Sequence, residues 1–186
     1  MFAEALTEVV RRLDRATQAG LLRGYALIGG LAAGIWGLPR ATHDVDMALV
    51  PATTDTAAIA ETLGARFLAS GPGDPLRGVF QTTVPVQSRT VPIQLILLPG
   101  RWNEVILKNI ERVSVLGCAV PVVAWQTLVL LKVYAGGPQD LLDAASVITT
   151  RTPGATVIAE MQALADTVGV SAELAALLKR MGHDRL

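Results

Sequence analysis

Two aspartates two positions apart, Asp44 and Asp46, have the residue type and spacing best suited to chemistry in this sequence. They open an apolar run that predicts a strand over residues 44–50. Because strand side chains alternate between faces, both carboxylates should point the same way. Neighbouring carboxylates repel unless a positive charge lies between them, and hard oxygen ligands suit Mg²⁺. The pair therefore indicates a divalent cation site, with two exposed residues of an edge strand as the alternative.

A glycine pair, Gly29-Gly30, lies upstream where a predicted strand over 25–28 meets a predicted helix over 30–37. Glycine lets a phosphate approach the backbone, and the first N–H groups of a helix attract anions. The alternative is a tight strand-to-helix turn without a ligand. Together with Asp44 and Asp46, the glycine pair favours a functional site that binds phosphate and metal.

The elements that must position these residues form a mixed pattern. The sequence predicts, outside the ranges given above, helices over 3–18, 55–69, 102–110, 125–135, 138–150, 154–168 and 171–181, and strands over 78–84, 89–98 and within 112–123. We expect an α/β (α+β) core with an N-terminal helix over residues 1–120. A helical C-terminal region over 121–186 should pack on this core.

Composition narrows the class of protein. The 186 residues carry 16 Lys and Arg against 16 Asp and Glu, so the chain has no net positive charge that would attract nucleic acid. The hydrophobic share of 51% favours a dense core or a surface covered by a second copy, as in a homo-oligomer. Cys118 is the only cysteine, which excludes an internal disulfide. Gly117, Pro121 and Gln126 interrupt the longest uncharged stretch, so we expect a cytoplasmic protein without a membrane span.

The order of these motifs resembles that of a known family. Gly29-Gly30, then Arg40 and Thr42, then Asp44 and Asp46 are similar to the opening of the nucleotidyltransferase fold of the DNA polymerase beta superfamily. More narrowly, they resemble the minimal bacterial AbiEii- and MenT-type toxin nucleotidyltransferases.

A second segment, residues 128–148, supports the resemblance. Lys132 is followed by Gly136-Gly137 and then by Asp140 and Asp143, and this order resembles the helical region of the same branch.

The resemblance implies a two-metal transfer of a nucleoside monophosphate from a nucleoside triphosphate (NTP), with Mg²⁺ as the cofactor and Mn²⁺ as the alternative. It implies that Asp44 and Asp46 hold metal and that Gly29 and Gly30 cradle phosphates. The roles implied for the remaining residues are neutralisation of the triphosphate by Lys132, a place facing the site for Asp140, and phosphate contact or loop bracing by Arg40 and Thr42.

Structural alternatives exist for two of these residues. Lys132 could instead extend its ammonium to solvent along an apolar helix. Asp140 could simply favour the N-terminus of a helix that begins at Pro138.

One position departs from the family pattern. The family places a third carboxylate on a neighbouring strand, and the matching strand over 91–97 offers only Gln94. An amide oxygen can bind a metal but brings no negative charge. Nucleotide binding is therefore better supported than turnover, and Gln94 is retained as a candidate metal ligand.

We accordingly expect a Mg²⁺-dependent nucleotidyltransferase. By resemblance the acceptor is RNA, such as a tRNA end, or a protein, in a toxin–antitoxin system with an antitoxin partner; a small-molecule acceptor is a variant. The alternative is a degenerate protein that binds a nucleotide or a partner without chemistry. A fold without any nucleotide site is the third interpretation.

Overall fold

A mixed β-sheet with helices against it forms the body of the protein, which the computed structural model describes over residues 2–182. The strands are β1 (Leu22–Leu27), β2 (Val45–Pro51), β3 (Arg66–Ala69), β4 (Gly78–Val86), β5 (Arg89–Leu97), β6 (Ile110–Val115) and β7 (Cys118–Val123). The helices are α1 (Phe2–Gln18), α2 (Gly29–Trp36), α3 (Thr56–Leu63), α4 (Asn103–Lys108), α5 (Trp125–Ala135), α6 (Pro138–Arg151), α7 (Ala155–Val168) and α8 (Ser171–Arg180), with a short 3₁₀ turn, η1 (Gly100–Trp102). The α/β class predicted from the sequence is confirmed.

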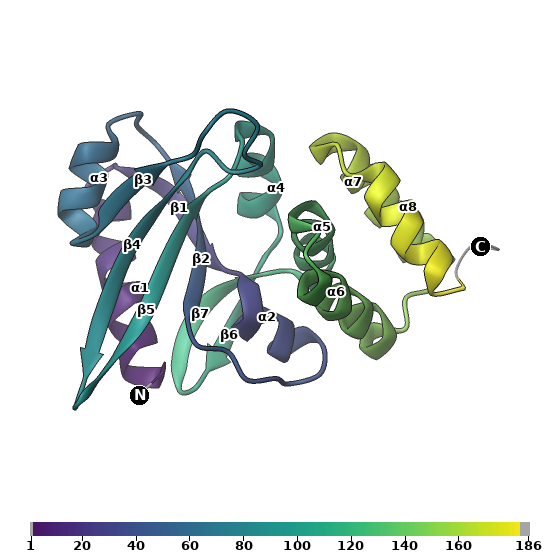
Figure 1. Ribbon diagram of the computed structural model, residues 1–186, viewed down its shortest axis with the longest axis horizontal. Helices are drawn as coiled ribbons and strands as arrows, with labels where there is room; N and C mark the ends of the chain where they lie inside the picture. Colours follow the sequence, from purple (N-terminus) through teal and green to yellow (C-terminus); the bar gives the residue numbers. More distant parts are fainter. Residues whose placement is uncertain (1, 183–186) are drawn as a thin grey trace.

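The sheet has the strand order β3-β4-β5-β2-β1-β7-β6 (Figure 1). Strand β2 runs antiparallel to β1 and parallel to β5, and its register places Asp46 beside Gln94. The two polar positions predicted on different strands are therefore direct neighbours across the sheet.

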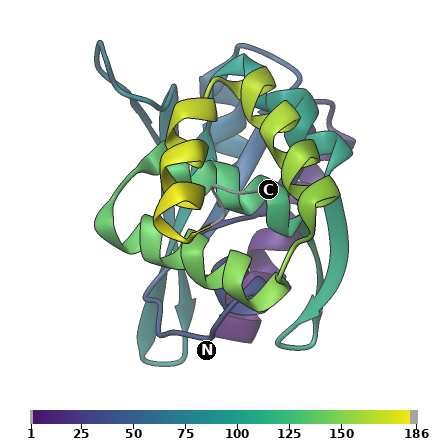
Figure 2. The ribbon, with the colours of Figure 1, turned by 90° about the vertical axis from the view of Figure 1, so that its right-hand side faces the viewer.

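Helices pack on both faces of the sheet. Helix α1 contacts β1, β4, β5 and β7 on one face, where Leu6, Val9 and Leu13 are fully or almost fully buried. Helices α2 and α4 contact β2, and α5 and α6 pack together beside α2. Helices α7 and α8 lie outside α5 and α6 (Figures 1 and 2). The sheet face away from α1 is exposed over β3, β4 and the first residues of β5. Its exposed side chains there include Arg66, Gln81, Thr83, Thr90 and Pro92.

The predicted helix over 55–69 is wrong in its second half. Helix α3 begins after Asp55, whose side chain accepts a hydrogen bond from the Ala58 N–H, and it ends at Gly64 in the left-handed conformation (φ 59°). The chain then forms β3, which pairs antiparallel with β4. Pairing with a distant strand outweighs local helix propensity here.

Within residues 2–182, none of the helices combines the length and the apolar character that a membrane span requires.

Candidate functional site

A pocket of about 270 Å³ lies where β2 and β5 meet α2, α5 and α6. Of the nine residues predicted from the sequence, six line it: Gly29, Asp44, Asp46, Gln94, Lys132 and Asp140. Its remaining wall is apolar and consists of Ile28, Ile96, Leu128, Leu131 and Ala135. The structure thus brings together residues from both motifs, which are about 90 positions apart in the chain.

The two aspartates share the pocket but differ in their partners. Asp44 lies one residue before β2 and accepts hydrogen bonds from Thr42 Oγ1 at 3.0 Å and Gln94 Nε2 at 3.2 Å. Asp46 lies within β2, and its carboxylate accepts a hydrogen bond from the Gly30 N–H at the start of α2. Thr42 therefore acts as a support of Asp44, and the lining of the pocket does not include it.

The glycine pair is packed against these side chains. Gly29 adopts a left-handed conformation (φ 67°), and a Cβ on it would lie 2.0 Å from Asp46 Oδ2. A Cβ on Gly30 would lie 2.7 Å from Thr42 Oγ1. Glycine is required at position 29, where a side chain would meet Asp46 on a left-handed backbone, whereas a side chain at position 30 would force Thr42 to shift.

Lys132 faces inward across the pocket. Its side chain is 8% exposed, and its ammonium lies 2.8 Å from both Asp140 Oδ1 and Asp143 Oδ2. The alternative in which this lysine extends to solvent is therefore wrong. Asp140 lies in the first turn of α6, so it occupies a favourable helix position and also lines the pocket.

Asp143 is the residue whose importance sequence reasoning missed. It is buried and receives a two-pronged contact from Arg40, through Nε at 2.8 Å and Nη2 at 2.9 Å. Gln139 Nε2 also donates to it, at 2.9 Å. Arg40 therefore braces the loop before β2 against α6, and the lining of the pocket does not include it. The available signal was the i, i+3 spacing of Asp140 and Asp143, which places both on one helix face.

Burial and charge set the ionisation of the site. Burial, and then the neighbouring Asp44 charge, raise the pKa of Asp46 to about 6. Burial also opposes ionisation of Asp143, but hydrogen bonds from Arg40, Lys132 and Gln139 outweigh it and lower the pKa to about 2. Burial disfavours the charged form of Lys132 as well, yet its two carboxylate partners raise its pKa above the ordinary value. The charge of Lys132 is neutralised by its two carboxylate partners, whereas no described residue forms an ion pair with Asp46, whose surroundings disfavour its negative charge.

The donor set suits a cation that brings further ligands with it. In the described part of the chain, no three His, Cys, Asp or Glu side chains cluster as metal ligands. Asp44 and Asp46 offer two carboxylates, and Gln94 adds an amide beside them. Mg²⁺ commonly binds through one or two carboxylates together with substrate phosphates. A positive charge here would also favour the ionised form of Asp46, which burial and then the Asp44 charge disfavour by raising its pKa.

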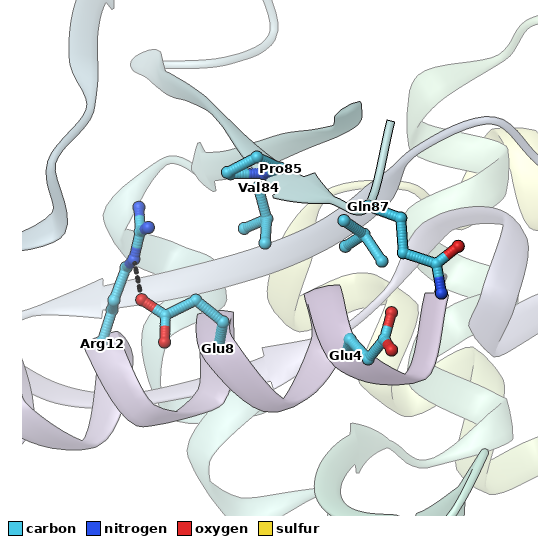
Figure 3. A pocket seen from close by; sticks show the side chains of 7 residues that line it. Glu4, Glu8, Arg12, Val84, Pro85 and Gln87 are labelled. Atoms are coloured by element: carbon cyan, nitrogen blue, oxygen red, sulfur yellow. Dashed lines mark hydrogen bonds and ion pairs between the residues drawn. The ribbon is translucent and has the colours of Figure 1, made fainter. Parts of the chain in front are cut away.

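A second hollow, of about 400 Å³, lies between α1 and the end of β4 (Figure 3). Its charged side chains include Glu8 and Arg12, which pair with each other at 2.8 Å. It contains none of the residues predicted from the sequence motifs.

Comparison with solved structures identifies the fold. The solution structure of the antibiotic-resistance factor ANT(2'')-Ia is 13% identical with a TM-score of 0.50, over 96% of this chain and 97% of that chain. An antigenic nucleotidyltransferase-like protein from Paracoccidioides brasiliensis is 16% identical with a TM-score of 0.52, over 94% and 90%. The chain therefore has a nucleotidyltransferase-like fold. In sequence comparisons, no family model and no curated protein matches it.

Proposed function

We propose that the protein transfers a nucleoside monophosphate from an NTP to an acceptor hydroxyl. The observation that carries the proposal is the pocket in which Asp44 and Asp46 face Lys132 beside the first N–H groups of α2. In the reaction, the acceptor oxygen bonds to the α-phosphorus, and the bond from that phosphorus to the bridging oxygen breaks. Pyrophosphate leaves, and the hydroxyl proton passes to solvent or to a pocket carboxylate.

Each residue has a role that its contacts support. The N-terminus of α2 at Gly29 and Gly30 attracts phosphate oxygens. Lys132 offsets negative charge on the triphosphate when it exchanges Asp140 for a phosphate oxygen. Asp143 is a positioning residue, since it holds Lys132 and Arg40 by direct contacts. The apolar wall of Leu128 and Leu131 suits the face of a base.

Asp44 and Asp46 are the proposed ligands of Mg²⁺, or of Mn²⁺ in its place. When bound, such a cation stabilises charge on the attacking and leaving oxygens. Gln94 would add one neutral oxygen if its amide turned from Asp44.

The second candidate function is a degenerate nucleotidyltransferase that binds a nucleotide or a partner protein without chemistry. One observation favours it: the register places Gln94, an amide, directly beside Asp46. A site with two carboxylates and an amide has less negative charge to hold a second cation than a site with three carboxylates.

The expectations about the subfamily, the acceptor, the partner and the cell compartment rest on the resemblance of the sequence motifs. We propose on that basis an AbiEii- or MenT-type protein of the cytoplasm, with an RNA or protein acceptor and an antitoxin partner. Self-association into a homo-oligomer is part of the same proposal.

Label transfer tests the reaction. The protein is incubated with Mg²⁺, cell RNA and protein fractions, and an NTP labelled at either the α- or the γ-phosphate. Nucleotidyl transfer predicts α-label on a macromolecule and γ-label in pyrophosphate, both absent with Asp44→Ala. The second candidate function predicts Mg²⁺-dependent retention of intact NTP by the protein and no release of pyrophosphate.

A further inference from the structure

A row of polar side chains leads from the pocket across the open face of the sheet. The register pairs Asp46 with Gln94, Gln94 with Gln81, and Gln81 with Arg66. Paired positions on neighbouring strands present their side chains to the same face, so the row crosses four strands from β2 to β3. Three interstrand spacings of about 4.8 Å place the backbone of Arg66 about 14 Å from that of Asp46.

The row crosses another hollow, which lies beside the pocket and is distinct from the one between α1 and β4. This acceptor hollow, of about 490 Å³, is lined by Arg66, Gln81, Thr82, Thr83, Pro92, Ile93 and Gln94. Gln94 lines both the pocket and the acceptor hollow. A molecule lying in the acceptor hollow would therefore reach the carboxylates of the pocket past a single side chain.

The pocket and the acceptor hollow differ in charge. The pocket contains Asp44, Asp46 and Asp140 against one lysine. No described residue that lines the acceptor hollow is acidic, and its charged member is Arg66. The Arg66 side chain is exposed and forms no hydrogen bond or ion pair among residues 2–182. Because Gln94 is an amide, no negative charge stands between Arg66 and the edge of the pocket.

A further hollow, of mixed charge, adjoins the acceptor hollow. This hollow of about 440 Å³ shares Thr82 and Thr83 with the acceptor hollow and contains Arg15 of α1. The Arg15 guanidinium also lacks a partner among the described residues, whereas those of Arg11 and Arg12 are held by Glu8. The same hollow contains Glu61, and α1 packs on the opposite face of the sheet. Only an anion long enough to pass around the unpaired edge of β4 at Thr82 and Thr83 could therefore extend from Arg66 to Arg15.

We propose that the acceptor is a phosphate-bearing alcohol whose phosphate lies on Arg66 while its hydroxyl reaches the pocket beside Gln94. This inference rests on the proposed function, since it concerns the acceptor of that reaction. Amide and hydroxyl side chains such as Gln81 and Thr83 hydrogen-bond sugar hydroxyls, and guanidinium groups bind phosphate by a fork of two N–H groups. A polycationic acceptor such as an aminoglycoside would instead meet like charge at Arg66. The phosphate comes either from a nucleic-acid strand or from a small sugar phosphate, and Arg15 distinguishes these sources.

Binding without turnover tests the inference. The probe is a 5′-fluorescein RNA dodecamer with a free 3′-hydroxyl, measured by fluorescence anisotropy with Mg²⁺ and no NTP, in competition with ribose 5-phosphate. Arg66→Glu should weaken binding of the RNA or of the competing ribose 5-phosphate by about tenfold or more. Arg89→Glu is the matched control because Arg89 is exposed on the same sheet and lines none of these hollows, so it should stay within about twofold.

The outcomes distinguish a nucleic-acid strand from a small sugar phosphate as the source of the phosphate. They also distinguish failure of this inference from failure of the proposed function. If Arg15→Glu also weakens RNA binding, the phosphate belongs to a nucleic-acid strand. If ribose 5-phosphate competes and Arg15→Glu has no effect, it belongs to a small molecule. Binding by Arg66→Glu equal to that of the wild type, or no binding of either probe by the wild type, overturns the inference. The proposed function is judged separately, by the shift in melting temperature that an NTP with Mg²⁺ causes in the same preparations.

Discussion

The carboxylate of Asp46 fills the space beside Gly29: a Cβ on this glycine would lie 2.0 Å from Asp46 Oδ2. This contact joins the strand-to-helix turn to the metal side of the pocket. It explains the glycine by a side chain of the site itself, in addition to the left-handed backbone (φ 67°) that glycine tolerates.

Gly29→Ala should therefore displace Asp46 and abolish Mg²⁺-dependent NTP binding. Gly20→Ala is the matched control because Gly20 has a similar φ of 73° and a Cβ there would meet nothing within 4 Å. Both variants carry backbone strain of about 1–2 kcal/mol, but only Gly29→Ala adds the clash. Urea unfolding and NTP titration measure the two effects. Equal behaviour of the two variants would show that the contact with Asp46 is unimportant.

Asp46→Asn should make the folded protein more stable at high pH. Burial and Asp44 raise the pKa of Asp46 from 3.8 to about 6, so ionisation of this group is harder in the folded state than in the unfolded state. A raised pKa gives stability that is present below about pH 4 and is lost as the pH rises through about 6. At about pH 8 the variant should gain roughly 1–3 kcal/mol over the wild type, and the gain should shrink towards zero near pH 4.

Urea unfolding at a series of pH values measures this gain. Each protein serves as its own control across the series. A gain that is independent of pH, or a loss at about pH 8, would contradict a carboxylate whose pKa is raised by burial at this position. The same variant should lose Mg²⁺-dependent NTP binding, because function and stability oppose each other at such a site.

Asp143→Asn should destabilise the protein because it removes the shared partner of two cations. Lys132 keeps Asp140, but Arg40 loses its two-pronged contact with a carboxylate. We expect a loss of about 2 kcal/mol in the free energy of unfolding, less than for a fully orphaned buried charge. The comparison is Glu104→Gln, which breaks the exposed pair with Arg23 and should change stability little. Losses of similar size in the two variants would remove Asp143 from its positioning role.

Gln94→Asp tests whether the site lacks only its third carboxylate. Without metal, the variant should be less stable because it loses the hydrogen bond to Asp44 and adds a third negative charge. With Mg²⁺ or Mn²⁺ it should gain more stability than the wild type, and label transfer should increase. Gln81→Asp makes the same chemical change one strand further from Asp46 and should show neither effect. No added response to metal in Gln94→Asp would argue against Gln94 as a metal-facing position.

The sequence was sufficient to predict the lining of the pocket but not the contacts that support it. The alternation of Asp44 and Asp46 follows from strand periodicity, whereas the resemblance to a family led to Gln94, Lys132 and Asp140, and the structure places all five in one pocket. The contact of Arg40 with Asp143 joins residues 103 positions apart, and only the folded chain brings them together. Strand β3 and Arg66 were missed for a similar reason, because a four-residue strand forms through pairing with β4. The division of the chain at residue 120 stays a prediction.

Thermal unfolding with each of the four NTPs, with and without Mg²⁺, tests the central claim most directly. A ligand at a hundred times its dissociation constant adds about 2.7 kcal/mol of stability, which for a chain of this size raises the melting temperature by about 5–10 °C. The account predicts such a shift with at least one NTP, dependent on Mg²⁺ and absent in Asp44→Ala. No shift with any NTP, or an equal shift in Asp44→Ala, would contradict a nucleotide site at Asp44 and Asp46.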